Sequence, residues 1–227
     1  MNKSNKKLSQ KQRIKARRAA AKKKKMLTRN LSVVILIAAA GFSLFTSVNR
    51  PKANQARMEK NPTKGNPNAA VILTEYADFG CEACQAWHKS GEITKILTQF
   101  EGDLAFVWRD FPIILPPYSN RAAEAGQCAF DQDKFWEFHD ATYERSDYSA
   151  LRNDDLFTYA ELAGLEMENF ETCFDSKIHT ATVKLDLDAA RDFGFRGTPS
   201  FTVNGQQIVG ASPSVLVTAI QNALSTQ

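Results

Sequence analysis

The chain has 227 residues, 43% of them hydrophobic and 24% charged, which suits one large folded domain or two small ones. Its net charge of +4 hides an asymmetry: residues 1–30 carry thirteen Lys and Arg and no acid, whereas the remainder has sixteen basic and 25 acidic residues. From residue 69 onward, eleven basic residues stand against 24 acidic ones, which argues against a nucleic-acid-binding domain.

The N-terminal part predicts a membrane anchor. Residues 31–48 contain no charged side chain and are just long enough to span a bilayer as a helix. The basic residues precede this segment, so the positive-inside rule predicts a cytoplasmic tail over 1–30 and an extracytoplasmic location for everything after residue 48. A cleaved signal peptide is the alternative, but the basic region is unusually long, which favours an uncleaved signal anchor. The basic tail is also expected to bind anionic membrane lipid.

The next segment, residues 49–68, is polar and contains three prolines. This composition predicts a linker that separates the membrane segment from a folded domain. The domain itself is expected over residues 69–227.

The domain opens with an apolar run over residues 70–76, which predicts a buried strand, followed by a helix that begins near Cys81 and Cys84. Two intervening residues place the two sulfurs about one helical turn apart, close enough for a reversible disulfide. In the first helical turn, free N–H groups and the helix dipole favour the Cys81 thiolate, whereas Cys84 is more shielded. The pattern suits thiol-disulfide exchange, but half of a zinc site has the same spacing, so the motif alone does not decide between them.

The remaining elements alternate between strand and helix patterns. Residues 104–111 predict a strand, and three prolines then break the chain into a loop: Pro112, Pro116 and Pro117. Helical patterns cover residues 120–130, 134–144, 154–162, 167–174 and 180–193. Residues 201–203 and 207–209 predict a hairpin around Asn204-Gly205, and Ser212 is expected to cap a final helix with Pro213 in its first turn.

Pro199 opens the first strand of that hairpin. A proline is tolerated at the start of a strand, and a cis Thr198-Pro199 bond would expose backbone beside the cysteines. An ordinary trans proline in a turn is the alternative.

The Cys81-x-x-Cys84 motif and the segment Gly197-Thr198-Pro199-Ser200 together resemble the thioredoxin superfamily. The roughly one hundred residues between them leave room for an inserted domain, which is similar to the DsbA-like branch of that superfamily. Residues 133–140 also resemble the inserted domain of that branch. The resemblance covers about residues 66–225 and implies an α/β thioredoxin fold with a helical insertion at about 119–192, here preceded by one transmembrane helix.

The resemblance also implies roles for five residues. Cys81 is expected to be the nucleophile that forms the mixed disulfide and Cys84 the resolving thiol. The backbone at Thr198 and Pro199 is expected to position the substrate. The family places a buried acid at the position of Glu75, where it exchanges protons with the second cysteine, although strand alternation alone does not decide which face Glu75 occupies.

Four aromatic residues near these positions are expected to be structural. Phe79 and Trp87 flank the cysteines and are expected to pack. His88, one turn after Cys84, is expected on the helix surface, with electrostatic tuning of Cys84 as the alternative. His139 is expected to be a structural partner rather than a ligand.

Cys128 and Cys173 fall within two of the predicted helices. Outside the membrane, an even number of cysteines favours disulfides, so these two are expected to bond and to stabilise the insertion by about 4 kcal/mol in the chain-entropy model. Two buried free thiols and a four-cysteine zinc site are the alternatives.

The resemblance implies an enzyme that forms disulfides in exported proteins with free cysteines. It also implies a membrane quinone-linked partner that takes the electrons, and no metal or organic cofactor. A monomer without nucleic-acid partners is expected. A reductase or isomerase on the same fold, and a non-catalytic anchored binding module with structural cysteines, are the alternatives.

The two residues between the cysteines, Glu82 and Ala83, depart from the family pattern. Strong oxidants of the family often carry proline followed by an aromatic residue or histidine there. A carboxylate next to Cys81 opposes its thiolate and nearly cancels the effect of the helix dipole, so a milder oxidant is expected.

Overall fold

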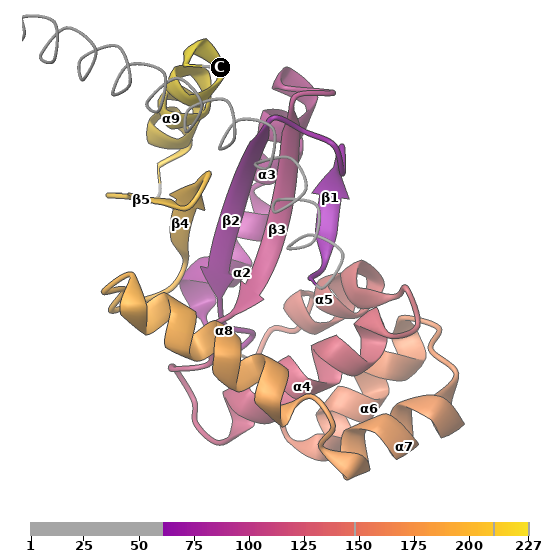
Figure 1. The fold of residues 1–227 in the computed structure, drawn as a ribbon. Coiled ribbons are helices and arrows are strands. Elements are labelled where there is room, and N and C mark those ends of the chain that lie inside the picture. Colours follow the sequence, from indigo (N-terminus) through magenta and orange to yellow (C-terminus); the bar gives the residue numbers. More distant parts are fainter. Residues whose placement is uncertain (1–60, 148, 211, 227) are drawn as a thin grey trace, which may run out of the picture. The chain divides into compact units, whose positions relative to one another are not determined.

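The computed structural model describes residues 61–147, 149–210 and 212–226. Their centre is a five-stranded sheet with the strand order β1-β3-β2-β4-β5 (Figure 1). The strands are β1 (Thr63–Gly65), β2 (Val71–Ala77), β3 (Leu104–Asp110), β4 (Ser200–Val203) and β5 (Gln206–Ile208). β2 and β3 pair in parallel, and the other neighbours pair antiparallel.

Strand β2 is central because it is apolar on both faces. Val71 and Leu73 pack on one face against α3 (Glu92–Gln99) and α9 (Pro213–Ser225), in a core cluster that also holds residues of β3 and β4. On the other face, Tyr76 packs in a cluster with residues of α8 (Thr180–Asp192). This two-sided burial explains why the segment reads as a continuous apolar run rather than as an alternating pattern.

Five helices separate β3 from β4, as the sequence predicts. They are α4 (Tyr118–Phe130), α5 (Phe135–Tyr143), α6 (Asn153–Leu162), α7 (Met167–Ser176) and α8. Helices α4 to α7 gather beyond one end of the sheet, and α8 leads back toward β4 (Figure 1). All five lie within a few residues of their predicted bounds. The mixed α/β architecture with an inserted helical domain is therefore confirmed.

Aromatic side chains join this insertion to the sheet. Phe79, from the loop after β2, contacts Trp108 of β3 with ring centroids 5.1 Å apart, and Phe138 of α5 at 5.8 Å. All three side chains are buried. Phe79 therefore packs, as expected, in a core shared by the sheet and the insertion.

A disulfide connects two helices of the insertion. Cys128 of α4 and Cys173 of α7 are bonded, with their Cα atoms 5.8 Å apart. This confirms the predicted pairing, in place of free thiols or a four-cysteine zinc site.

The predicted boundary between linker and domain is wrong by several residues. Strand β1 lies inside the segment 49–68, and it pairs with β3 so that Thr63 faces Val107. The segment has almost no apolar pattern because β1 is a short edge strand that is only partly buried. Its contacts come instead from backbone pairing and from Lys64, whose Nζ lies 4.2 Å from the centre of the Trp136 ring. The folded domain therefore begins before residue 69.

The predicted transmembrane segment, residues 31–48, lies outside the described residues. Within the described part of the chain, none of the helices combines the length and the apolar character needed to cross a bilayer.

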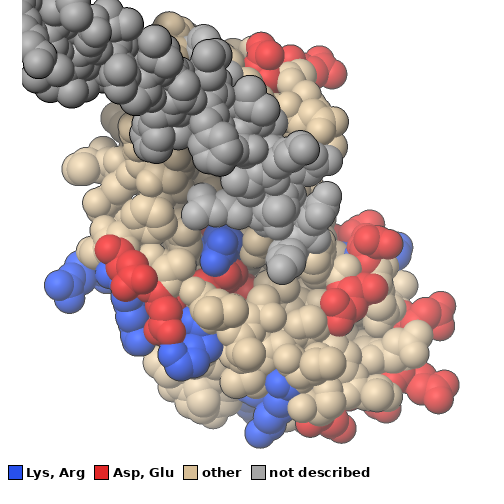
Figure 2. Space-filling view, in the orientation of Figure 1, with Lys and Arg blue, Asp and Glu red and all other residues tan. Residues whose placement is uncertain are grey.

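Acidic side chains outnumber basic ones on the face seen in Figure 2, where they gather mainly over the helical insertion. This distribution agrees with the excess of acidic residues from residue 69 onward.

Candidate active site

Cys81 and Cys84 lie where the loop after β2 meets α2 (Glu82–Lys89). Cys81 is the N-cap residue of this helix, and its sulfur accepts a hydrogen bond from the backbone N–H of Cys84 at 3.3 Å. Cys81 is 4% exposed and Cys84 is fully buried. The predicted placement at the start of the helix is confirmed, and both cysteines carry free thiols in this structure.

The two thiols have opposite acidities. Interaction with the Cys84 thiol, then with Thr198 and the backbone N–H groups of Cys84 and Ala83, lowers the pKa of Cys81 to about 6 against the opposing effect of burial. Burial, then the Cys81 thiol and the charge of Glu75, raise the pKa of Cys84 well above its ordinary value. At neutral pH, Cys81 is therefore mainly a thiolate and Cys84 a thiol.

The loop before β4 places its backbone against Cys81. The Thr198-Pro199 peptide bond is cis, so the alternative of an ordinary trans proline is wrong. The sulfur of Cys81 lies 3.3 Å from the Thr198 carbonyl oxygen, across 117 positions in the chain. Thr198, Pro199 and the cysteines are therefore brought together as expected.

Glu75 lies in the middle of β2, on the same face as Val71 and Leu73, and it is fully buried. Its Oε2 atom is 2.9 Å from Nε2 of His88, and Oε1 has no hydrogen-bond partner among the described residues. Its charge reaches Cys84, where it contributes to the raised pKa. The predicted burial of Glu75 is confirmed.

The expected surface position of His88 is wrong, because only 10% of its side chain is exposed. Residues four positions apart share one face of a helix, so His88 follows the buried Cys84 toward the sheet. Its ring lies 4.3 Å from that of His139 in α5, measured between centroids. Spacing along α2 is sufficient to infer this once Cys84 is known to be buried.

His139 occupies a buried position between the sheet and the insertion. Its Nδ1 atom is 2.7 Å from Oδ1 of Asp140, and its ring centre is 4.5 Å from that of Tyr143. Burial and the neighbouring His88 lower the pKa of His139 to about 3, so the ring is neutral at physiological pH. It is a structural partner, as expected, and it links the site to the insertion.

Comparison with known proteins agrees with this geometry. A family model described as thioredoxin matches residues 57–222. The chain belongs to this thioredoxin family. The predicted thioredoxin fold is therefore confirmed.

Among solved structures, the chain is similar to a thioredoxin-like oxidoreductase from Silicibacter pomeroyi DSS-3. That match has 28% identity and a TM-score of 0.65, and it covers 73% of this chain and 93% of that one. The reduced disulfide oxidoreductase DsbG from Mycobacterium tuberculosis matches with 25% identity and a TM-score of 0.55, over 73% and 84% of the two chains. BdbD from Bacillus subtilis, at 22% identity, shares the fold with a TM-score of 0.65 over 74% and 95%. The structural neighbours are DsbA-like thiol-disulfide oxidoreductases, which supports a general oxidoreductase role.

Curated relatives include two Na⁺/H⁺ antiporters. NhaA 3 of Salinispora tropica is 33% identical over 150 residues, which cover 66% of this chain and 22% of that protein. NhaA 1 of Salinispora arenicola is 30% identical over 201 residues, which cover 78% and 30%. The chain thus spans less than a third of the length of these relatives.

The residues that hold the loop between β2 and Cys81 in place are not among the site residues predicted from the sequence. The carboxylate of Asp78 accepts hydrogen bonds of 2.7 Å from the backbone N–H groups of Gly80, Ile113 and Ile114. Burial raises the pKa of Asp78 above its ordinary value, against these hydrogen bonds. An aspartate two residues before a glycine, after a buried strand, is a turn signal that could have identified this role.

The insertion contributes further contacts to the same loop. Tyr143 donates a hydrogen bond from its hydroxyl to the carbonyl of Asp78 at 3.1 Å, and Arg145 donates to the carbonyl of Phe79. Gln85 of α2 donates in turn to the carbonyl of Arg145 at 2.9 Å. These pairs lie roughly 60 positions apart in the chain, so no local pattern predicts them.

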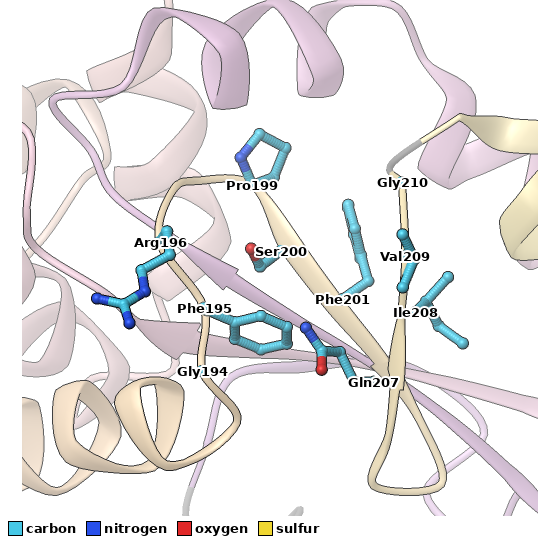
Figure 3. A pocket seen from close by; sticks show the side chains of 10 residues that line it. All are labelled: Gly194, Phe195, Arg196, Pro199, Ser200, Phe201, Gln207, Ile208, Val209 and Gly210. Carbon is cyan, nitrogen blue, oxygen red and sulfur yellow. The ribbon is translucent and has the colours of Figure 1, made fainter.

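A shallow cavity of about 290 Å³ lies beside Pro199, between the loop before β4 and the hairpin (Figure 3). The rings of Phe195 and Pro199 and the side chain of Ile208 line it, whereas the guanidinium group of Arg196 points away from the hairpin. Val209, at the rim, is 87% exposed. The cavity thus offers a partly apolar surface next to the backbone that faces Cys81.

Proposed function

We propose that the protein is a thiol-disulfide oxidoreductase that forms disulfides in exported proteins through Cys81 and Cys84. The observation that carries this proposal is the pairing of an acidic thiol, Cys81, with a buried thiol of raised pKa, Cys84, one turn apart. Opposite acidities assign opposite roles, because the cysteine with the lower pKa is the better leaving group, whereas the cysteine with the raised pKa stays protonated.

The reaction begins with the oxidised pair. A substrate thiolate attacks the sulfur of Cys81, the bond between Cys81 and Cys84 breaks, and Cys84 leaves as a thiolate that takes up a proton. A second substrate thiolate then attacks the substrate sulfur of the mixed disulfide, and Cys81 leaves as a thiolate. The substrate loses two electrons and gains a disulfide, and the enzyme is left with a Cys81 thiolate and a Cys84 thiol.

Glu75 supplies the proton that Cys84 needs. Its carboxyl group is buried on the strand beneath α2, and its charge acts on Cys84. We propose that His88, hydrogen-bonded to Glu75, fixes the carboxyl group in this position. Thr198 and Pro199 hold the substrate backbone against Cys81, and the cavity beside Pro199 accepts a neighbouring substrate side chain.

The low pKa of Cys81 favours oxidation over reduction. A stabilised thiolate makes the reduced enzyme more favourable, and this raises the reduction potential of the pair. Continued turnover requires an electron acceptor, for which we propose a membrane quinone-linked partner. A reductase or isomerase would use the same residues with a lower potential.

We also propose that the thioredoxin domain lies outside the cytoplasm. An uncleaved anchor over residues 31–48, held by anionic lipid at the basic tail, would present a monomeric domain to exported proteins. N-terminal sequencing of the native protein tests this arrangement. A mature N-terminus after Ala40 would contradict the anchor.

Transfer of a disulfide to a reduced model protein with two cysteines tests the proposed activity. The oxidised full chain is expected to oxidise this substrate stoichiometrically and much faster than glutathione disulfide does. The rate of oxidation is expected to fall at least about a thousandfold in Cys81→Ser. The matched control is the Cys128→Ala/Cys173→Ala protein, which is expected to retain it. Reduction of insulin by the dithiol form without net oxidation of the substrate would support a reductase instead, and no exchange in either direction would contradict the proposal.

A further inference from the structure

The disulfide of the insertion lies at a junction of three helices that also brings two other metal-binding side chains together. Cys128 is near the end of α4, Asp131 follows that helix, Cys173 is in α7, and His179 precedes α8. Nε2 of His179 lies 2.6 Å from Oδ2 of Asp131, and the sulfur of Cys173 lies 3.9 Å from the same oxygen. The donor atoms of Cys128, Cys173 and His179 all lie within 4.8 Å of one another.

We propose that, when this disulfide is reduced, Cys128, Cys173, His179 and Asp131 form a tetrahedral site for Zn²⁺. Two thiolates, an imidazole and a carboxylate are a donor set that suits zinc rather than calcium or magnesium. With Zn–S bonds of about 2.3 Å and Zn–N bonds of about 2.0 Å, the donors of a tetrahedral site lie roughly 3 to 4 Å apart. The nitrogen and the oxygen are 2.6 Å apart and the two sulfurs are bonded, so both pairs must separate, the sulfurs by the larger distance.

Replacement of the Cys128–Cys173 disulfide by a bound Zn²⁺ conserves electrons and protons. A dithiol, either a protein or a small molecule, gives two electrons and two protons to the disulfide and closes to its own disulfide. Zn²⁺ then displaces the two protons from Cys128 and Cys173 to solvent and undergoes no redox change itself. With the carboxylate of Asp131, the occupied site has a net charge of −1.

Contacts other than the disulfide hold the ligands near one another. Thr180, next to His179, donates a hydrogen bond to Glu124 of α4 at 2.6 Å, and Arg121 of α4 donates to the carbonyl of Phe174 in α7 at 3.1 Å. These bonds keep α7 and the start of α8 against α4 when the sulfurs part.

The proposed ligands differ in their exposure to solvent, and the most exposed one gives a metal ion access to the site. Cys128 is 1% exposed, the side chain of His179 is 16% exposed, and that of Asp131 is 51% exposed. The ion can therefore approach from the Asp131 side and meet the buried thiolate last. The insertion would thus have two alternative links between the same helices, a disulfide in oxidising conditions and a metal ion in reducing ones.

The test uses the full chain with Cys81→Ser and Cys84→Ser, so that Cys128 and Cys173 are the remaining thiols. After reduction and removal of the reductant, this protein is expected to bind one Zn²⁺ per chain in competition with a chromogenic chelator. Co²⁺ in its place is expected to give the visible bands of tetrahedral coordination and a thiolate charge-transfer band. The same protein with its disulfide intact is expected to bind neither ion.

One ligand variant and one matched control test whether His179 binds the metal. His179→Gln is expected to weaken Zn²⁺ binding at least about tenfold, whereas Asp175→Asn, at an exposed position of α7, is expected to leave it unchanged. Circular dichroism with and without Zn²⁺ separates binding from folding, because a site formed from these helices restores any helical signal lost on reduction. The proposal is overturned if the reduced protein binds no stoichiometric Zn²⁺, if Co²⁺ is octahedral, or if both variants bind equally.

Discussion

The molecule contains two pairs of cysteines whose surroundings are opposite. Cys81 and Cys84 lie one turn apart at a helix start, where the Cys84 thiol, Thr198 and backbone N–H groups lower the pKa of Cys81. Cys128 and Cys173 are 45 positions apart and are bonded between two helices of the insertion. The structural setting of a thiol, rather than the presence of a cysteine pair, therefore separates exchange chemistry from a stable covalent link.

The largest expected effect concerns stability. Replacing both cysteines of the insertion, in Cys128→Ala/Cys173→Ala, is expected to lower the free energy of unfolding by about 4 kcal/mol, because a long loop is no longer closed in the unfolded chain. Replacing Cys81 and Cys84 opens a loop of only two intervening residues and is expected to cost at most about 2 kcal/mol in the same model. Urea unfolding of the oxidised proteins measures both values. Equal losses would mean that the two bonds do not differ in this way.

The second effect is the pH dependence of the reactivity of the Cys81 thiol. With a pKa near 6, alkylation of Cys81 in the reduced protein is expected to rise between pH 5 and 7 and to be constant above that. Because this pKa is lowered on folding, the thiolate stabilises the reduced folded protein fully above pH 9, and this contribution is lost as the pH falls through about 6. Alkylation rates measured by mass spectrometry test the profile. A midpoint near pH 9 would contradict the acidity assigned to Cys81.

These two predictions rest on features that the sequence reveals to different degrees. The strand before Cys81, the helix that begins near Cys81 and the hairpin after Pro199 follow from local patterns, because each depends on neighbouring residues. The acidity of Cys81 does not follow from such patterns. The sequence predicts that repulsion by Glu82 offsets the helix dipole, but Glu82 is exposed, and the hydrogen bonds of the Cys81 sulfur with Cys84 and with the Thr198 carbonyl lower the pKa of Cys81.

The rest of the site depends on contacts between distant segments. The sequence cannot show that Tyr143 and Arg145 of the insertion bind the loop before Cys81, and spacing along α2 directs His88 toward the sheet without showing that Glu75 is its partner. Edge strand β1 was missed for the same reason, since backbone pairing rather than apolar side chains holds it in place.

A third prediction separates proton transfer from thiol acidity. His88→Phe keeps an aromatic ring at this position but removes the hydrogen bond to Glu75. The mixed disulfide between Cys81 and a model peptide is expected to resolve about tenfold more slowly, because the Glu75 carboxylate is no longer held where it can accept the proton that Cys84 must lose before it attacks. Stopped-flow measurement of peptide release tests this. A change in the pKa of Cys81 without slower resolution would assign His88 an electrostatic role instead.

The smallest expected effect concerns Glu82. Glu82→His removes a negative charge next to Cys81 and is expected to lower the pKa of Cys81 by up to about one unit and to raise the reduction potential of the pair. The effect is small because Glu82 is exposed to water. Thiolate absorbance against pH measures the shift, and Glu82→Gln is the matched control for loss of charge alone. An unchanged or higher pKa would contradict the electrostatic account of this position.

The most direct test of the difference between the two cysteine pairs is a graded reduction of the oxidised full chain. The protein is equilibrated in dithiol buffers of decreasing potential, alkylated, and the modified cysteines are identified by mass spectrometry. We expect Cys81 and Cys84 to be reduced first, at a distinctly higher potential, while Cys128 and Cys173 remain bonded until much stronger reducing conditions. Simultaneous reduction of both pairs, or reduction of Cys128 and Cys173 first, would contradict the assignment of exchange chemistry to one pair and a stable link to the other.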